Sequence, residues 1–372
     1  MIDNAYDLLC RLKQYREIIL YGAGNTARKI LPWLEKNNVK VAYIMETKAS
    51  AEHLGQYRLC SVTEHPVDCT MPVLIAVTEA YREMLEGVLQ AEGYSHILTI
   101  TDDCITRIGS EMRTMLQFQT HLVEHCNLKC RGCYHFSSLA DEEYLTLEEF
   151  EQDIARLSQL FDGEAEEILL LGGEPLLHPR LNRFFEITRN YFSRGCIKLL
   201  SNGLLLPKMK EDFFAAIREN KVELWITKYP VNFDYDRAET YALQNGVDIH
   251  YFNREPVRTL GHQPLDVEGA QNATVNWHSC YRANLCVDLK HGKMFPCIVP
   301  AEIKPFCAYF NQELEVTTDD YVDIYSVDSG QELLERLKKP IPFCRYCNRA
   351  SIEKFGTIPW SRTKFEMLEW TE

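Results

Sequence analysis

The stretch Thr120-His-Leu-Val-Glu-His-Cys-Asn-Leu-Lys-Cys-Arg-Gly-Cys133 decides how this chain is organised. Its three thiols, Cys126, Cys130 and Cys133, follow a Cys-x3-Cys-x2-Cys spacing on one short loop, so all of them can face a single centre. Soft thiolates favour an iron–sulfur cluster or zinc. Zinc would need a fourth ligand nearby, whereas three thiolates leave one iron of a cluster open to a substrate.

The composition narrows the class of protein around this loop. The 372 residues suffice for two or three domains and a sizeable core. We find no apolar run of membrane-spanning length and no signal peptide, so the fourteen cysteines indicate metal or cluster ligation in a reducing cytoplasm. The net charge of −14, without a Lys/Arg cluster, argues against nucleic acid as a main partner. We therefore expect a cytoplasmic enzyme with no membrane partner.

Two downstream motifs accompany the cysteine loop. They read Leu-Leu-Leu-Gly172-Gly173-Glu174-Pro and Leu-Leu-Ser201-Asn202-Gly. In this order the three motifs resemble those of the radical SAM superfamily. The resemblance implies a 4Fe–4S cluster whose open iron chelates S-adenosylmethionine (SAM) and splits it into methionine and a 5′-deoxyadenosyl radical.

The resemblance also implies roles for these residues. Glu174 would accept hydrogen bonds from the SAM ammonium group, and Gly172 and Gly173 would let the backbone approach the methionine part. Ser201 and Asn202 would reach the ribose hydroxyls or the carboxylate. These five residues form the expected SAM site.

Further residues lie beside these motifs. The family usually has an aromatic residue directly before the third cysteine, where this chain has Gly132, and we place the following Tyr134 with the cofactor-binding residues. Lys228 and Tyr229, at the end of an expected strand, are candidates to face the substrate as catalytic residues. The neighbouring histidines read as structural; they are His125, His135 and His178.

Apolar strands alternate with amphipathic helices around the motifs. Strands are expected at Met115–Glu124, Glu167–Leu171, Cys196–Leu200, Val222–Thr227 and Val247–Phe252, and helices at Leu147–Leu160, Phe184–Phe192 and Phe213–Arg218. This alternation predicts parallel βα units, with the motifs at strand ends, where α/β barrels place their chemistry. The resemblance implies a partial (βα)6 barrel.

The first part of the chain has an α/β pattern of its own. Ile18–Tyr21 runs into Gly22, Gly24 and Ala27, which fit Gly-x-Gly-x-x-Gly/Ala, and Glu46 ends the next strand, where a ribose hydroxyl would be recognised. A helix N-terminus there would face a phosphate. The segment resembles short Rossmann-like domains of sugar-modifying proteins. It could bind a nucleotide or nucleotide-sugar, or it could serve only as a docking scaffold.

A second set of thiols follows near the end of the chain. Cys280 and Cys297 form a Cys-x11-Gly-x4-Cys pattern, and Cys344 and Cys347 form Cys-x-x-Cys. This arrangement resembles the Twitch domain, a shortened relative of the SPASM extension, and implies that these four thiols hold an auxiliary 4Fe–4S cluster. A zinc ribbon would need the same four thiols. Two further cysteines could replace a ligand; they are Cys286 and Cys307.

We therefore predict an α/β protein of three domains. A Rossmann-like nucleotide-binding or docking domain spans 1–106, the partial barrel 107–265, and the auxiliary-cluster domain 266–372. The expected reaction is hydrogen abstraction from a sugar, cyclitol or nucleotide-linked substrate, followed by oxidation or epimerisation with the auxiliary cluster as electron conduit. Its partners would be this small molecule and a flavodoxin- or ferredoxin-type reductant. The alternatives are a SPASM-like peptide-modifying enzyme and a non-catalytic zinc protein.

Overall fold

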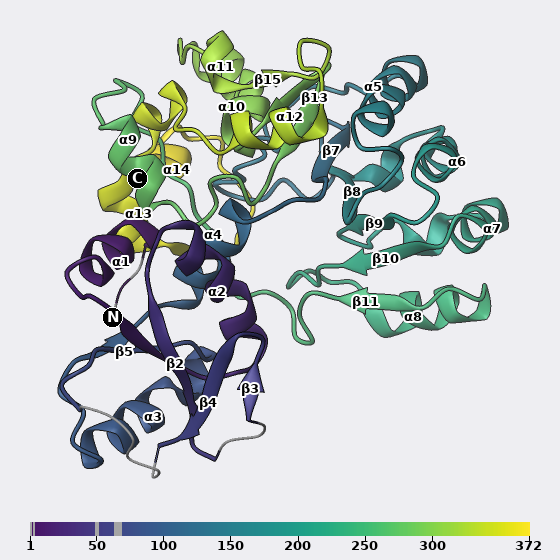
Figure 1. Cartoon of the computed structure of the whole chain (residues 1–372). Coiled ribbons are helices and arrows are strands. Elements are labelled where there is room, and N and C mark those ends of the chain that lie inside the picture. Colours follow the sequence, from purple (N-terminus) through teal and green to yellow (C-terminus); the bar gives the residue numbers. More distant parts are fainter. Residues whose placement is uncertain (1, 3, 49–51, 63–68) are drawn as a thin grey trace. The chain divides into compact units, whose positions relative to one another are not determined.

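The computed structural model describes residue 2 and residues 4–48, 52–62 and 69–372. Its internal contacts divide the chain into two units, Met1–Arg113 with Trp277–Leu285, and Thr114–Asn276 with Cys286–Glu372. Each unit has a mostly parallel sheet of its own (Figure 1). The division into three domains stays a prediction.

The first unit is an α/β sandwich around a six-stranded sheet of order β3-β4-β2-β1-β5-β6. Its elements are α1 (Ala5–Leu12), β1 (Ile18–Tyr21), α2 (Asn25–Lys36), β2 (Val41–Glu46), β3 (His53–Leu54), β4 (Tyr57–Ser61), β5 (Val73–Ile75), α3 (Glu79–Ala91), β6 (Ile97–Thr99) and α4 (Asp102–Glu111). All neighbouring strands pair in parallel except β3 and β4. The order β4-β2-β1-β5-β6 matches the first five strands of the doubly wound order 3-2-1-4-5-6.

Alternation along β1 explains why this sheet is covered on both faces. Ile18 and Leu20 belong to the core that contains α1, α2 and α4, whereas Ile19 and Tyr21 belong to a second core that contains α3. Successive side chains of a strand point to opposite faces, so a strand buried on both faces is apolar at every position.

The second unit is built on an eight-stranded sheet of order β11-β10-β9-β8-β7-β13-β14-β15. Its strands and α-helices are β7 (Gln117–Val123), α5 (Leu147–Leu160), β8 (Glu167–Gly172), α6 (Leu181–Tyr191), β9 (Cys196–Ser201), α7 (Glu211–Glu219), β10 (Val222–Ile226), α8 (Tyr235–Gln244), β11 (Ile249–Tyr251), β12 (Thr259–Gly261), β13 (Asp288–Lys290), β14 (Lys293–Phe295), α10 (Ile298–Glu302), α11 (Lys304–Phe310), β15 (Val322–Asp323), α12 (Gly330–Leu337), α13 (Arg349–Phe355), β16 (Thr357–Pro359) and α14 (Leu368–Thr371). Its short 3-10 helices are η1 (Pro175–Leu177), η2 (Leu206–Lys208), η3 (Thr318–Asp320) and η4 (Pro342–Tyr346), and helix α9 (Ala273–Ser279) has residues in both units.

The five strands β7–β11 run in parallel and in chain order. The resemblance implied six such strands. In the structure β13 pairs in parallel with the free side of β7 and turns back into β14, so a hairpin continues the sheet there. The sequence predicts a hairpin here, with strands at Leu285–Leu289 and Lys293–Cys297 around a His291-Gly292 turn; β13 and β14 are shorter than these strands.

Helices α5 to α8 cover one face of the β7–β11 sheet (Figure 1). Phe118 and Leu122 of β7 enter the core beneath these helices. The residues between them, Gln119 and His121, point to the opposite face because the side-chain period of a strand is two. The polar side chains of Gln119 and His121 therefore lie on the face away from the helices. No helix among the described residues is long and apolar enough to cross a membrane.

Candidate functional site

A cavity of about 270 Å³ lies where the strands β7 to β11 end. Its walls include most of the predicted metal and SAM-binding residues, namely Cys126, Cys130, Cys133, Tyr134, Gly172, Gly173, Ser201, Asn202 and the candidate Tyr229. The cysteine loop follows β7, the glycines end β8, and Ser201 ends β9. The carboxyl ends of parallel strands meet at one edge of a sheet, which explains how motifs distant in sequence share one cavity.

Of the three loop thiols, Cys130 is buried, and Cys126 and Cys133 are half-buried. Burial raises the pKa of Cys126 and Cys133, and burial followed by the charge of Cys133 raises the pKa of Cys130 to about 12. A buried thiolate needs a cation beside it, and metal ions that bind thiols supply that charge. The donor set therefore fits an iron–sulfur cluster.

The spacing of the thiols also bears on zinc. A tetrahedral zinc ion needs its ligand atoms gathered around one point. Among the described residues, the group of three ligand atoms within 4.8 Å of one another that could hold an ion contains no cysteine. Cluster thiolates each bind a separate iron and need no such gathering, so the arrangement favours a cluster over zinc.

Glu174 ties the ends of two strands together. Its side chain is fully buried and accepts hydrogen bonds from Ser201 Oγ at 2.7 Å, Asn202 N at 2.9 Å and Leu176 N at 3.0 Å. Burial raises the pKa of Glu174 to about 6, against the lowering effect of these three donors. The role toward the SAM ammonium stays a prediction, and the structure adds that Glu174 organises Ser201 and Asn202 for it.

Close packing of the backbone is a second reason for glycine at position 173, beside the expected approach to the methionine part of SAM. A Cβ atom at this position would lie 1.9 Å from the carbonyl oxygen of His125. The ends of β7 and β8 therefore approach each other so closely that a side chain cannot fit between them. The glycine requirement comes from the protein backbone itself.

Asn202 is already engaged with the cysteine loop. Its Nδ2 donates to Asn127 Oδ1 at 2.8 Å and lies 3.8 Å from Cys126 Sγ. The amide thus fixes the position of the first cysteine. Its expected contact with the ribose or carboxylate of SAM remains a prediction. The sequence did not predict Asn127 as a partner of Asn202, because no motif spacing marks this residue.

The two catalytic candidates differ in placement. Tyr229 lines the cavity, and burial, followed by the nearby cysteines, raises its pKa well above the usual value. Its backbone N–H donates to the hydroxyl of Tyr235 at 2.9 Å. The Lys228 ammonium lies 4.2 Å from the centre of the Tyr251 ring, and Lys228 is not among the residues that line the cavity. Both catalytic roles stay predictions.

The histidines near the motifs have structural contacts. His178 Nε2 lies 3.1 Å from Leu145 O, and its Nδ1 accepts from Arg180 N at 3.0 Å. His125 meets Tyr144 edge-on. Only His135 lines the cavity.

Gly132, the position where the family usually has an aromatic residue, is explained by the end of the chain. Its φ is +58°, and a Cβ atom there would lie 2.8 Å from Glu369 O and 3.0 Å from Ile358 Cδ1. Residues 357–370 therefore occupy the space that a side chain would need. Sequence reasoning missed this segment because it carries no motif.

The second set of cysteines is only partly assembled within one unit. Cys297 precedes α10, Cys344 lies in η4 and Cys347 follows η4. Asn276 Nδ2 donates to the carbonyl oxygens of Cys344 and Cys347 at 2.8 Å each, and Gln263 Nε2 lies 3.4 Å from Cys347 Sγ. Cys280 belongs to the other unit, so ligation of one cluster by all four thiols stays a prediction.

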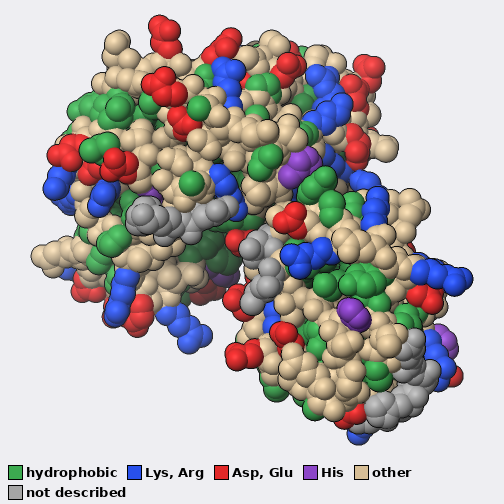
Figure 2. All heavy atoms as spheres, turned by 90° about the vertical axis from the view of Figure 1, so that its left-hand side faces the viewer, with side chains coloured by type: hydrophobic (Ala, Val, Ile, Leu, Met, Phe, Trp, Pro, Cys, Tyr) green, Lys and Arg blue, Asp and Glu red, His purple; other side chains and the backbone are tan. Residues whose placement is uncertain are grey.

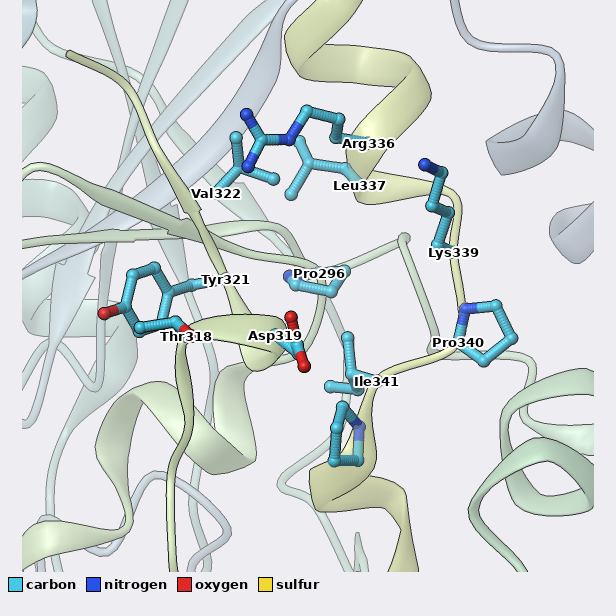
Figure 3. Close-up of a pocket in the computed structure, with 11 residues that line it drawn as sticks. Pro296, Thr318, Asp319, Tyr321, Val322, Arg336, Leu337, Lys339, Pro340 and Ile341 are labelled. Atoms are coloured by element: carbon cyan, nitrogen blue, oxygen red, sulfur yellow. The ribbon is translucent and has the colours of Figure 1, made fainter. Parts of the chain in front are cut away.

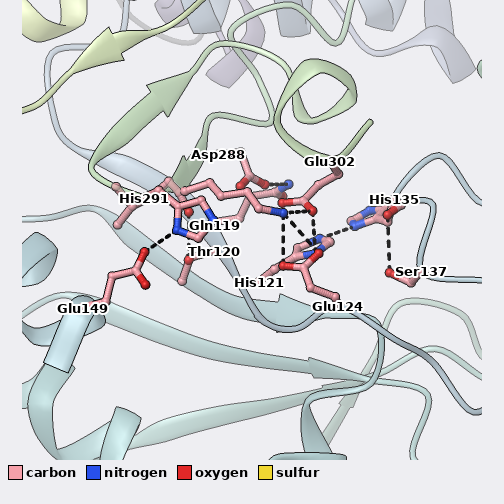
Figure 4. A network of polar contacts seen from close by, with 12 residues as sticks. Gln119, Thr120, His121, Glu124, His135, Ser137, Glu149, Asp288, His291 and Glu302 are labelled. Atoms are coloured by element: carbon pink, nitrogen blue, oxygen red, sulfur yellow. Dashed lines mark hydrogen bonds and ion pairs between the residues drawn. The ribbon is translucent and has the colours of Figure 1, made fainter. Parts of the chain in front are cut away.

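A buried ionic network lies next to the cysteine loop (Figure 4). The Lys290 ammonium is 3.1 Å from each carboxylate oxygen of Glu124 and also pairs with Glu302. His121 Nδ1 lies 3.3 Å from Glu302 Oε2, and its Nε2 lies 2.9 Å from His135 Nδ1. His121, Glu124 and Glu302 are the group that could hold an ion, but the ammonium of Lys290 already supplies the positive charge. We assign this site no metal.

Asp288 makes this network sensitive to pH. It is fully buried and accepts from Gln119 Nε2 at 2.9 Å, and burial, followed by the charge of Glu302, raises its pKa to about 7. The folded protein therefore holds this proton more tightly than the unfolded chain, so stability falls as the pH rises from the ordinary carboxyl range through 7.

Asp288→Asn should remove that dependence. Between pH 5 and pH 8 the wild-type free energy of unfolding should fall by roughly 2–3 kcal/mol more than that of the variant, from the pKa difference. Urea unfolding at the two pH values measures this, with the exposed Asp248→Asn as the matched control. If the free energy of unfolding fell equally in wild type and in Asp288→Asn, Asp288 would not be the source of the pH dependence.

A larger cavity lies elsewhere in the second unit. It measures about 390 Å³ and is lined by residues of η3, β15 and α12 together with the prolines before Cys344 (Figure 3). None of the predicted site residues lines it. We assign it no ligand.

The comparisons with known proteins support the family resemblance carried by the cysteine loop. Residues 121–240 match the model of the radical SAM superfamily. The subtilosin biosynthesis protein AlbA of Bacillus subtilis (strain 168) is 31% identical over 129 residues, which are 34% of this chain and 28% of AlbA. GTP 3′,8-cyclase of Helicobacter pylori (strain HPAG1) is 23% identical over 269 residues, which are 68% of this chain and 81% of that enzyme.

Two solved structures are similar as well. BtrN in complex with AdoMet and 2-DOIA is 16% identical, covers 64% of this chain and 96% of its own, and has a TM-score of 0.38. A native anSMEcpe structure with AdoMet and a peptide is 19% identical, covers 37% of this chain and 42% of its own, and has a TM-score of 0.31.

The site is that of an α/β protein with three thiols and two polar motifs at the ends of parallel strands, an arrangement that fits a thiolate-ligated cluster. The family match over residues 121–240, together with the Cys-x3-Cys-x2-Cys loop, supports assignment to the radical SAM superfamily. Its cofactors are accordingly SAM and a 4Fe–4S cluster.

Proposed function

We propose that this protein is a radical SAM enzyme that removes hydrogen from a sugar, cyclitol or nucleotide-linked substrate and thereby oxidises or epimerises it. The observation that carries the proposal is the shared cavity of about 270 Å³ between the loop thiols and the ends of β8 and β9. When bound, the cluster and SAM supply a carbon radical strong enough to take hydrogen from an unactivated C–H bond.

The chain's own residues would divide the work at the ends of these strands. Cys126, Cys130 and Cys133 would hold the cluster. Glu174 would receive the ammonium of SAM, with Ser201 fixing the carboxylate by its 2.7 Å hydrogen bond. The surrounding walls would exclude water, which strengthens these polar contacts.

Two observations support a nucleotide-linked substrate. This chain matches one relative over 81% of that relative's length, and the relative is named GTP 3′,8-cyclase. In the first unit, Gly22 and Gly24 connect β1 to α2, and Gly24 caps α2 without a side-chain hydrogen bond. The first N–H groups of that helix could therefore face a phosphate.

The other residues proposed for this nucleotide site differ in their support. Glu46 ends β2, beside the glycine turn in the parallel sheet, where it could contact a ribose. Ala27 is fully buried against the sheet and would serve only the close packing of α2. The nucleotide site at Gly22, Gly24, Ala27 and Glu46 remains our proposal.

A peptide substrate is the second candidate. AlbA, which shares 31% identity over 129 residues, is a biosynthesis protein of the bacteriocin subtilosin. The segment matched is only 28% of AlbA, so the likeness concerns the part around the SAM site. Cys280, Cys297, Cys344 and Cys347 would hold the auxiliary cluster, which would supply an electron acceptor for the oxidation of either substrate class.

The surface offers no sign of a nucleic-acid partner on the face that Figure 2 draws. Among the described residues shown there, Lys and Arg side chains are interspersed with Asp and Glu. Nucleic-acid binding proteins instead gather basic side chains on one face. A reductant of the flavodoxin or ferredoxin type is the remaining partner that we propose.

Anaerobic reconstitution tests the proposed function. The full chain, loaded with iron and sulfide and reduced with dithionite, should bind about eight irons, four in each cluster, and convert SAM into methionine and 5′-deoxyadenosine. Cys344→Ala with Cys347→Ala should retain about four irons. Product analysis with nucleotide-sugars, free cyclitols and peptides then separates the substrate classes. Colourless zinc-loaded protein without SAM cleavage would refute the proposal.

A further inference from the structure

The segment Thr357–Trp370 is fastened across the cysteine loop. Two backbone hydrogen bonds of 2.9 Å join them, from Arg131 N to Ser361 O and from Thr363 N to Lys129 O. Cys130 and Arg362 form an antiparallel bridge between these bonds. The loop that would hold the cluster is thus paired, like a strand, with a segment more than two hundred residues away in sequence.

Two tryptophan side chains complete this contact. Trp370 Nε1 donates to the carbonyl oxygen of Cys133 at 2.9 Å, whereas Trp360 Nε1 donates to the sulfur atom of Cys130 at 3.2 Å. An indole N–H can only donate. The first indole therefore supports the loop backbone, and the second acts directly on a predicted cluster ligand.

Trp360 is held in place by the strands around it. It follows β16, which pairs with β12, and its own backbone N–H donates to Arg258 O at 2.9 Å. Its ring lies 6.1 Å from that of Tyr229, a residue of the cavity wall. These contacts orient the indole N–H toward Cys130.

A fixed N–H donor on a cluster sulfur favours the reduced cluster. Reduction adds negative charge that is shared by the sulfur ligands, and hydrogen bonds to those sulfurs are among the features that set the potential. No other indole among the described residues donates to a loop sulfur.

We propose that Trp360 is a positioning residue that raises the reduction potential of the cluster on the Cys126–Cys133 loop through its hydrogen bond to Cys130. The proposal rests on the proposed function only in requiring that this cluster forms. Residues 357–370 then have two tasks, because they close the space beside Gly132 and deliver the donor.

A redox titration of Trp360→Phe tests this, because phenylalanine keeps a ring and removes the N–H group. The relevant cluster is the one whose electron paramagnetic resonance signal changes when SAM is added. At the potential where the wild-type cluster is half reduced, the ratio of oxidised to reduced cluster should be about tenfold higher in the variant, or about 59 mV for one electron. In Trp370→Phe, the matched control, this ratio should stay within about twofold of the wild-type ratio.

The possible outcomes separate this inference from the proposed function. A wild-type chain that forms no SAM-responsive cluster would end both. A normal wild-type cluster with the same midpoint in Trp360→Phe would end this inference alone. Trp360→His, which can again present a ring N–H, should recover part of the shift.

A second measurement decides the matter if Trp360→Phe does not assemble its cluster. Trp370→Phe protein with ¹⁵N-labelled indoles should show a ¹⁵N coupling to the reduced cluster in pulsed electron paramagnetic resonance. That coupling would support the Trp360 hydrogen bond. Its absence would overturn the proposal.

Discussion

Replacement of Cys130 by alanine should lower the rate of 5′-deoxyadenosine formation at least about a hundredfold, the upper end of what loss of a mere supporting group near a metal costs. The reason is that Cys130 lines the cavity, and burial raises its pKa to about 12 although the charge of Arg362 acts against the rise. Such a thiol becomes a thiolate when a metal binds it. Without it the cluster would keep two of its three protein ligands.

Cys196→Ala is the control for this experiment. Cys196 begins β9, at the strand end opposite the cavity, and it is not among the cavity-lining residues. Its rate and iron content should match those of wild type. Iron analysis and a chromatographic assay of 5′-deoxyadenosine measure both. A Cys130→Ala protein that keeps the wild-type rate would show that the loop is not the cluster site.

Local patterns in the sequence predicted the elements of the second unit well. The helix expected at Leu147–Leu160 is α5 with the same bounds, and the strand expected at Cys196–Leu200 is β9 with one residue more. Both have a strong apolar period, which depends only on neighbours a few positions away. The same apolar patterns also predicted that the motifs lie at the ends of strands.

Contacts between distant segments could not be predicted in this way. Lys290 and Glu124 are 166 residues apart, and Trp360 and Cys130 are 230 residues apart. Neither pair leaves a periodic trace, because each depends on how the β13–β14 hairpin and residues 357–370 pack against β7 and its loop. The insertion of β13 beside β7, in place of a further βα strand, is of the same kind.

Gly132 shows how such a contact can make a departure from a family pattern intelligible. By itself the missing aromatic residue raises the question of what packs near the adenine. In the structure the backbone of Glu369 and the side chain of Ile358 lie where a Cβ atom would be. The departure at position 132 and the segment 357–370 are therefore one feature, and substitution of Gly132 would disturb both.

Glu174→Gln should weaken SAM binding about 10- to 100-fold at pH 7.5, because a charge-assisted hydrogen bond of about 1.5–3 kcal/mol to the ammonium would be lost. Glu174 can also be titrated in place. Its folded pKa of about 6 lies above the usual value of 4.5, because burial disfavours the charge. Below pH 6 the free protein therefore carries a neutral Glu174, which cannot attract an ammonium group.

The sign of the pH effect follows from this linkage. SAM would bind the ionised form, so the complex holds the Glu174 proton less tightly than the free protein does, and wild-type affinity should fall as the pH drops from 7 to 5, by up to about tenfold per unit below 6. In Glu174→Gln the affinity should be low and nearly independent of pH over the same range.

Glu167→Gln is the matched control, since Glu167 lies at the other end of β8, where it pairs with Lys198. Anaerobic calorimetric titration of reconstituted protein with SAM measures all three. A wild-type affinity that is constant from pH 5 to 7, or a glutamine variant that still loses affinity on acidification, would mean that another group receives the ammonium. Glu174 would then serve only to join the ends of β8 and β9.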